Sequence, residues 1–367
     1  MDRRKPQGPL RKGWTTGACA AAAAKAAFRA LLTGTFPDTV SLRLPRGETP
    51  AFTLATRQTG DCWALAGVVK DAGDDPDVTH GAEIRAEVRF TPEGSGLTFA
   101  AGEGVGTVTL PGLPLAVGEP AINPVPRRMV EAALAEIAEE CGADLDVAVT
   151  VSVPGGAELA EHTLNGRLGI EGGLSILGTT GVVVPYSCAS WIHSIHRGID
   201  VARALGTKEV FAATGSTSEQ ALRDICSPPD HAIIDMGDFA GGLLKYLRKH
   251  PIARLTIGGG FGKLAKLAQG NLDLHSARSR LDMGRLAGTA REAGASAALV
   301  QTIEQANTGL EALRACREAD VDLPGRVAAG ARETALATLA GDIHVRVLVF
   351  DRQGQEVGSA GDRGDYD

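Results

Sequence analysis

The alternation of hydrophobic and polar positions divides the chain into two parts with different rhythms. In the first part, short alternating runs separated by turn residues predict a meander of strands at 39–44, 51–55, 63–69 and 83–90. In the second part, three apolar runs, each followed by a glycine-containing loop and a helical pattern, lie at 209–213, 231–235 and 254–257. A strand at 343–350 comes near the end. The second rhythm predicts a parallel sheet, and the three loops should share its carboxyl edge, where such sheets bind ligands.

Two helices are predicted in the first part. An alanine-rich run, capped by Thr15 or Thr16, extends to about Leu32, and its small side chains allow close packing. A second helix runs from about 125 to 140, with Asn123 as its natural cap. Lys25 on the first helix is either a solvated charge or an anion contact.

A glycine-rich stretch marks the expected domain boundary. Four glycines between 166 and 173 separate the two rhythms, which predicts domains at 1–170 and 171–367. Residues 358–367 form a polar tail that we expect to be disordered.

Composition narrows the classes of function. The 367 residues carry a net charge of −7 and only 4% aromatic residues, which argues against nucleic-acid binding. No stretch is long and apolar enough to span a membrane, and Lys25 and Arg29 interrupt the N-terminal run that mimics a signal peptide. The six cysteines are scattered without a CxxC pair, so we expect reduced thiols in a cytoplasmic protein.

Two Thr-Thr-Gly turns are the first candidates for ligand contacts. One lies at 15–17 and the other at 179–181, directly after Gly178. Small residues let backbone amides approach an anionic ligand, and threonine hydroxyls add donors. One turn in each half predicts a site between two lobes, with ordinary glycine turns capped by threonine as the alternative.

An acidic stretch at 70–81 is the second candidate. Asp71, Asp74, Asp75 and His80 belong to it, but it lacks the closing glutamate of a calcium loop. It is either an exposed acidic turn or a set of carboxylates held for proton handling beside His80. The glycines around Glu103 are followed by a strand pattern rather than a helix, which excludes a dinucleotide-binding loop.

Basic residues near helix starts are the third candidate. Arg127 and Arg128 lie in the first turn of the second helix, where cations are disfavoured unless they serve an anionic ligand, although a chance surface position competes. Lys263 follows three glycines at 258–260, and the loop lacks the pattern of a P-loop. A metal site at Cys188, His193 and His196 is disfavoured because no further ligand lies nearby in sequence.

Six segments together resemble the CbiD family, the cobalt-precorrin-5B C-1 methyltransferases of cobalamin biosynthesis; they lie at 11–22, 68–81, 102–107, 118–128, 169–181 and 261–268. The resemblance implies transfer of a methyl group from S-adenosylmethionine to carbon 1 of cobalt-precorrin-5B, giving cobalt-precorrin-6A. It also implies an α+β N-terminal domain followed by an α/β domain with a small parallel sheet, rather than a Rossmann-fold methyltransferase. The cobalt belongs to the substrate, so no protein-bound metal is expected.

The implied substrate is a tetrapyrrole with many carboxylates, which need fixed donors. Substrate contacts are expected at Arg11, Lys12, Thr15, Thr16, Gly17, Asn123, Arg127, Arg128 and Lys263. Contacts to the methyl donor are expected at Gly178, Thr179, Thr180, Gly181, Thr214, Gly215, Gly258, Gly259 and Gly260. Proton handling is expected at Asp71, Asp74, Asp75, His80 and Glu103.

Two rival functions remain open at this point. One is a methylase of a metal-free precorrin, and the other is a tetrapyrrole carrier without catalysis. No nucleic-acid or membrane partner is expected, and a homo-oligomer is compatible with the sequence.

Overall fold

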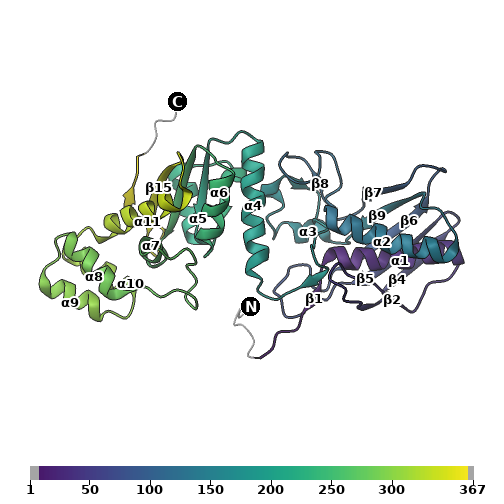
Figure 1. Ribbon diagram of the computed structural model, residues 1–367, viewed down its shortest axis with the longest axis horizontal. Coiled ribbons are helices and arrows are strands. Elements are labelled where there is room, and N and C mark those ends of the chain that lie inside the picture. The colour runs from purple at the N-terminus through teal and green to yellow at the C-terminus, as the bar shows by residue number, and fades with distance from the viewer. Residues whose placement is uncertain (1–7, 363–367) are drawn as a thin grey trace. The chain divides into compact units, whose positions relative to one another are not determined.

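A computed structural model describes residues 8–362, and the chain forms two compact units, Met1–Ser187 (unit 1) and Cys188–Asp367 (unit 2). Each unit has its own helices and its own main sheet (Figure 1). The segment 171–187, expected to open the second domain, belongs to unit 1. The reason is that β11 (Val182–Val183) pairs with β1 (Gly13–Trp14), which ties this segment to the N-terminal region.

The main sheet of unit 1 has five strands in the order β4-β5-β6-β9-β7. Their bounds are Thr56–Gly60, Trp63–Val69, Glu83–Phe90, Val147–Ser152 and Leu97–Ala101. All neighbours are antiparallel except β7 and β9. In β6 and β9 alternate residues are buried, as expected for strands with one covered face.

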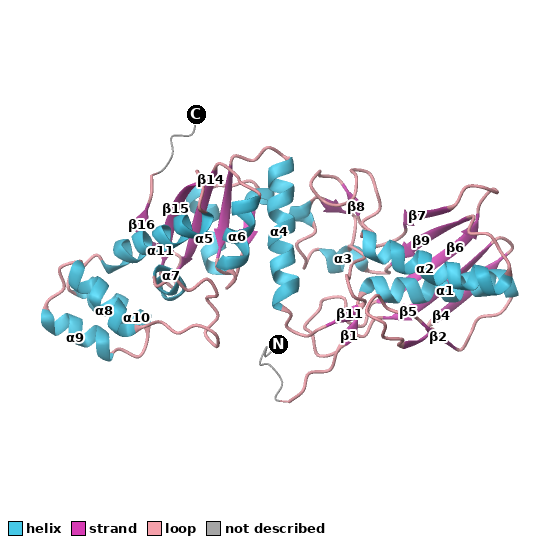
Figure 2. Cartoon of the chain, viewed as in Figure 1, coloured by secondary structure: helices cyan, strands magenta, loops and turns pink. Residues whose placement is uncertain are grey.

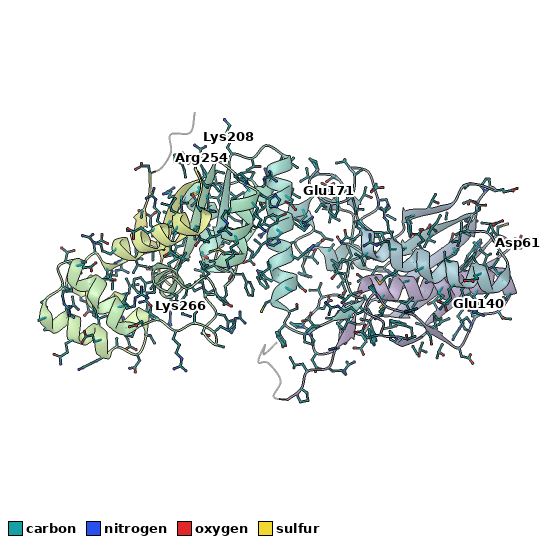
Figure 3. The ribbon with its side chains drawn as sticks, viewed as in Figure 1. Asp61, Glu140, Glu171, Lys208, Arg254 and Lys266 are labelled. Carbon is teal, nitrogen blue, oxygen red and sulfur yellow. The ribbon has the colours of Figure 1, made fainter. Side chains whose placement is uncertain are left out.

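The covered face packs against α1 (Thr16–Thr33), which also packs against α2 (Pro124–Cys141). Figure 2 shows the two helices side by side. Residues 16–28 of α1 are buried without interruption, so this helix has no solvated face in its first three turns. A helix that is apolar all round is stable only inside a core, and alanine lets its neighbours come close on every side. Both predicted helices are confirmed. Their far ends are joined by an ion pair between Arg29 and Glu140, the latter labelled in Figure 3.

Shorter elements complete unit 1. They are β2 (Thr39–Ser41) paired with β3 (Ala51–Thr53), β8 (Thr107–Val108) paired with β10 (Ile170–Glu171), α3 (Gly156–Ala160) and a 3-10 turn (Gly166–Leu168). The glycine loop around Gly104 lies against Gly156 and Gly173 so closely that a Cβ at Gly173 would come within 2.3 Å of the Gly104 carbonyl. These glycines therefore serve backbone packing.

The sheet of unit 2 has the order β13-β12-β14-β15-β16. The first four strands are parallel and the last is antiparallel. Their bounds are Ile233–Asp235, Glu209–Ala213, Arg254–Gly260, His344–Phe350 and Glu356–Ala360. The predicted parallel sheet is confirmed, as is the combination of an α+β part with an α/β part. Two details differ: Gly258–Gly260 extends β14 because it pairs with β15, and the expected tail contributes residues 358–360 to β16. Residues 363–367 lie outside the described residues.

Helices cover both faces of this sheet. One face packs against α5 (Ser216–Cys226) through Phe211, Leu222 and Phe350. The other face carries a larger core, to which α4, α6, α7 and α11 contribute; their bounds are Cys188–Ala204, Ala240–Lys249, Phe261–Ala268 and Leu323–Leu339. Between α7 and α11 the chain forms α8 (Met283–Glu292), α9 (Ala297–Gln305) and α10 (Gly309–Glu318).

Candidate functional site

The segment from Arg11 to Trp14 is held against the acidic loop of unit 1. The amide of Trp14 donates to the carbonyl of Asp71 at 2.7 Å, and the amide of Asp74 donates to the carbonyl of Arg11 at 3.0 Å. The amide of Arg11 in turn donates to the Asp74 carboxylate at 2.6 Å. A Cβ at Gly13 would overlap the backbone of Ala72, so only glycine permits this approach.

Side chains of the acidic loop are engaged in the same contact. The Arg11 guanidinium forms a two-pronged pair with the Asp71 carboxylate, with one contact of 2.8 Å. Its hydrogen bond, followed by that from the Gly73 amide, lowers the pKa of Asp71 to about 2. The Nδ1 of His80 accepts a hydrogen bond from the Ala72 amide at 3.1 Å, and Asp75 accepts one from the Tyr186 amide at 2.8 Å. The predicted proton-handling residues Asp71, Asp74 and Asp75 thus fasten the loop to its neighbours.

Beneath this loop lies a buried ion pair that the sequence analysis missed. The Lys70 side chain is 1% exposed, and its Nζ lies 2.5 Å from the Asp77 carboxylate. Burial opposes ionisation of Asp77, but the Lys70 charge and hydrogen bonds from Lys70 and Thr79 lower the pKa of Asp77. Burial raises the pKa of the nearby Cys19 thiol to about 12. The position of Lys70 directly after an apolar strand was the signal in the sequence that could have predicted this ion pair.

The two Thr-Thr-Gly turns contact each other within unit 1. Thr15 Oγ1 caps α1 by accepting from the Ala18 amide at 3.2 Å. Thr16 Oγ1 accepts from the Leu177 amide at 2.9 Å, and the amide of Thr15 donates to the carbonyl of Gly181 at 3.0 Å. Residues 178–181 were expected to bind the methyl donor together with the loops of the second domain. They lie instead beside the N-terminus of α1. Protein oxygens accept hydrogen bonds from the amides of Gly17, Ala18 and Cys19 in the first turn of that helix.

The adjacent arginines of α2 have different surroundings. The Arg127 guanidinium donates to the carbonyls of Ile122 at 2.8 Å and Pro120 at 3.2 Å, and it lies 5.5 Å from the centre of the Phe99 ring. The Arg127 side chain therefore stabilises the fold through contacts within the protein. Arg128 is exposed, and in the described part of the chain it has neither an ion pair nor a hydrogen bond.

The remaining unit 1 candidates are placed as follows. Asn123 precedes α2, but its side chain makes no capping hydrogen bond; its amide donates to the carbonyl of Ile176 at 3.0 Å. Glu103 is exposed in the glycine turn. An open hollow of about 850 Å³ lies between residues 41–49, α1 and α2, and of the expected contact residues Arg128 and Thr179 line it.

In unit 2 the residues expected to contact the methyl donor lie together at the carboxyl edge of the sheet. The amide of Thr214, which follows β12, donates to the carbonyl of Gly258 in β14 at 3.1 Å. Lys263 Nζ contacts the Thr214 carbonyl and lies 3.1 Å from the Asp238 carboxylate, so it connects the loops after β12 and β13. Lys263 therefore links two loops of unit 2 and also places a positive charge at this edge of the sheet.

The strand order makes the gap between β12 and β14 a topological switch point. From β12 the chain turns through α5 to β13 on one side, and then crosses back through α6 to β14 on the other side. The helices α5 and α7 consequently start on opposite faces of the sheet. Open parallel sheets of this order bind ligands at that crevice. Within residues 8–362 no side chain caps α5, and a Cβ built at Gly215 or Gly260 would meet no atom other than those of its chain neighbours within 4 Å.

The histidines of α4, disfavoured above as metal ligands, lie in partly buried surroundings, and His196 lies beside an aromatic ring. The His196 ring stacks on Tyr246 with 3.9 Å between centroids, and the Tyr246 hydroxyl donates to Asp200 at 2.7 Å. Burial lowers the pKa of both His193 and His196. Between residues 8 and 362 no three His, Cys, Asp or Glu side chains are arranged to hold a metal ion. Across the same residues, no helix combines the length and apolar character needed to cross a bilayer.

Comparisons with known proteins cover nearly the whole chain. Residues 3–185 match the CbiD family and residues 273–361 match the CbiD C-terminal domain. A cobalt-precorrin-5B C(1)-methyltransferase of Brucella abortus (strain S19) is 59% identical over 346 residues, which is 94% of each chain. One of Brucella anthropi is 58% identical over 354 residues, or 96% of each. A crystal structure of the cobalamin biosynthesis protein cbiD from Archaeoglobus fulgidus is 30% identical in sequence. The match covers 74% of this chain and 84% of the cbiD chain, with a TM-score of 0.41.

The first family match ends two residues before unit 1 does, and the second lies within unit 2. With matches in both units and close relatives along 94% of its length, this chain belongs to the CbiD family.

Proposed function

We propose that the chain is an S-adenosylmethionine-dependent C-methyltransferase that methylates carbon 1 of cobalt-precorrin-5B, giving cobalt-precorrin-6A in cobalamin biosynthesis. The observation that carries the proposal is the 59% identity, along 94% of both chains, to a relative named for this reaction. The aligned 346 residues reach into both units of this chain.

The chemistry asks for positioning rather than a protein nucleophile. An electron pair on carbon 1 attacks the methyl carbon of the sulfonium, the carbon–sulfur bond breaks, and S-adenosylhomocysteine leaves as a neutral thioether. Holding the two reactants in line and excluding water supplies the rate enhancement. The cobalt enters as part of the substrate.

The methyl donor binds, in this proposal, at the switch point of unit 2. Thr214 and Gly215 follow β12, and Gly258–Gly260 end β14 on the other side of the crevice. The uncapped start of α5 adds backbone amides for the carboxylate of the donor. Gly260 leaves its side-chain position empty, which allows a ligand close to the backbone.

Gly260→Val tests the donor site. The valine would project into open space, so we expect an unchanged unfolding midpoint but at least a tenfold weaker affinity for S-adenosylmethionine, measured by calorimetry. Gly288→Val is the matched control, because Gly288 in α8 is equally open and lies away from the sheet edge. Full donor affinity in Gly260→Val would remove the donor from this crevice.

The reaction itself is tested with purified protein, cobalt-precorrin-5B and methyl-labelled S-adenosylmethionine. We expect one labelled methyl group, located on carbon 1 by mass spectrometry. Parallel incubation with the metal-free precorrin shows which of the two forms is the substrate, because the preferred form is methylated faster. Macrocycle binding without label transfer, and without donor affinity, would instead identify a carrier.

A further inference from the structure

The hollow in unit 1 is lined by an excess of basic side chains. It opens between the β2–β3 connection and α2, and its basic side chains are Lys25, Arg43 and Arg128. Glu136 is the acidic residue in its lining, so three cations face one carboxylate and leave two net positive charges. Such an excess gives the hollow a positive potential, which attracts anions.

Lys25 is fixed at the wall of this hollow. Its side chain is 10% exposed, although it sits in the middle of the alanine-rich helix. Its Nζ donates to the Ser41 carbonyl at 2.9 Å and lies 2.8 Å from the Glu136 carboxylate. An ammonium group has three donors, and these two contacts leave one for a ligand.

Arg43 and Arg128 supply the other two positive charges of the hollow. Both are exposed, and within residues 8–362 neither has a hydrogen bond or an ion pair. Arg43 comes from the connection after β2 and Arg128 from the first turn of α2, so the two guanidinium groups approach the hollow from different elements. A guanidinium binds a carboxylate through two parallel hydrogen bonds.

The rest of the lining is part polar, through Ser41, Thr49 and Thr179, and part apolar, and the apolar part limits the kind of anion. Leu42, Leu44, Val125 and Met129 contribute to it, together with Ala132 and Ala133. A volume of about 850 Å³ is large for a simple inorganic anion and falls in the range of sites for organic ligands. The ligand should therefore carry carboxylates at the rim of a sizeable apolar body.

We propose that this hollow binds the carboxylate arms of the tetrapyrrole, with Arg43 and Arg128 as the recognising residues and Lys25 as a fixed donor between them. The proposal rests on the proposed function for the identity of the ligand, but the charge pattern and the apolar lining are independent of it. In this arrangement the basic residues of unit 1 bind the carboxylate arms at the edge of the macrocycle.

The test measures binding of uroporphyrin III, an octacarboxylate tetrapyrrole, by quenching of its fluorescence. The double variant Arg43→Ala/Arg128→Ala should bind it at least tenfold more weakly than the wild type, because two charge-assisted contacts are lost. Arg46→Ala is the matched control: Arg46 is exposed on the same connection and unpaired among the described residues, but it does not line the hollow. It should bind within about twofold of the wild type.

A second measurement separates this proposal from the reaction. With cobalt-precorrin-5B, the double variant should show a raised KM, an unchanged kcat and an unchanged affinity for S-adenosylmethionine. If the wild type methylates the substrate but the double variant binds uroporphyrin III and cobalt-precorrin-5B equally well, the hollow is not the carboxylate site and the proposed function stands. If the wild type transfers no methyl group while the variant loses macrocycle binding, the site stands and the proposed reaction fails. An absence of macrocycle binding by the wild type overturns the proposal.

Discussion

Gly178 is restricted both by its backbone conformation and by its closest neighbour. Its φ of +130° is one that side chains rarely adopt, and a Cβ at this position would lie 2.3 Å from Thr15 Oγ1. Thr15 is in turn the cap of α1. This glycine therefore sets the distance between residues 177–183 and the start of the helix.

Gly178→Ala should lower the free energy of unfolding by about 3 kcal/mol, the sum of backbone strain and displacement of the cap. Gly172→Ala is the control, because Gly172 also has a positive φ but meets nothing within 4 Å, and it should lose about 1 kcal/mol. Urea unfolding measures both values. Equal losses would show that the contact with Thr15 contributes nothing.

The carboxylate of Asp71 makes stability depend on acid pH. Its pKa is lowered from 3.8 to about 2 by the hydrogen bond from Arg11 and that from the Gly73 amide. Between these values the unfolded chain binds more protons than the folded chain, so stability rises with pH in that window. The contribution is fully present above about pH 4 and is lost as the pH falls towards 2.

Asp71→Asn should remove this dependence. The stability difference between wild type and variant, followed by urea unfolding, should shrink as the pH is lowered from 5 to 2.5. Arg11→Met should lose much of the same increment, and the double variant should lose little more than either single one. A difference that stays constant with pH would contradict the assignment.

At the scale of elements, α1 is the centre of unit 1. It packs against β5, β6 and α2, and the alanines between 18 and 27 are fully buried. Because no side of this stretch faces solvent, any added volume must displace a neighbour. The spacing between sheet and helices is thus set by the smallness of the side chains.

Ala23→Leu should destabilise the protein by about 1–3 kcal/mol through overpacking, although leucine is a good helix former. Ala135→Leu on the exposed side of α2 is the matched control and should change stability by less than about 0.5 kcal/mol. The comparison is made from chemical unfolding midpoints. A neutral Ala23→Leu would mean that the sheet and α2 can move apart.

At the scale of the whole molecule, the chain carries two separate large cores. One is built on α1 and the first sheet, and the other on β12, β14 and β15 with their helices. Each could unfold as a unit of its own. The proposed donor site lies entirely within the second.

Calorimetry should therefore resolve two unfolding transitions. S-adenosylmethionine at 100 times its Kd should raise the Tm of one of them by about 5–10 °C, which corresponds to about 2.7 kcal/mol of stabilisation. In Trp191→Phe the remaining tryptophans, Trp14 and Trp63, lie in unit 1. Their fluorescence should report the transition that the donor leaves unchanged; a shift there would contradict the donor site in unit 2.

Periodicity predicted the long helices and most of the buried strands, but it did not predict β4, β7 or β16. The runs at 209–213 and 254–257 read as buried strands, and the alanine-rich run read as a helix, because burial imposes local patterns that neighbours along the chain reveal. The family could also be identified from motifs, since close relatives preserve local sequence.

Only the tertiary structure decided what the candidate residues contact. Gly178 and Thr15 are far apart in sequence, and nothing local shows that their turns meet each other rather than a ligand. The adjacent Arg127 and Arg128 look equivalent in sequence, yet one is committed to backbone carbonyls and the other is unpaired in the described part of the chain. Pairing of β1 with β11 and the strand order of unit 2 depend on long-range contacts. Local sequence determines which element forms, whereas the partner of each side chain depends on which distant segment folds against it.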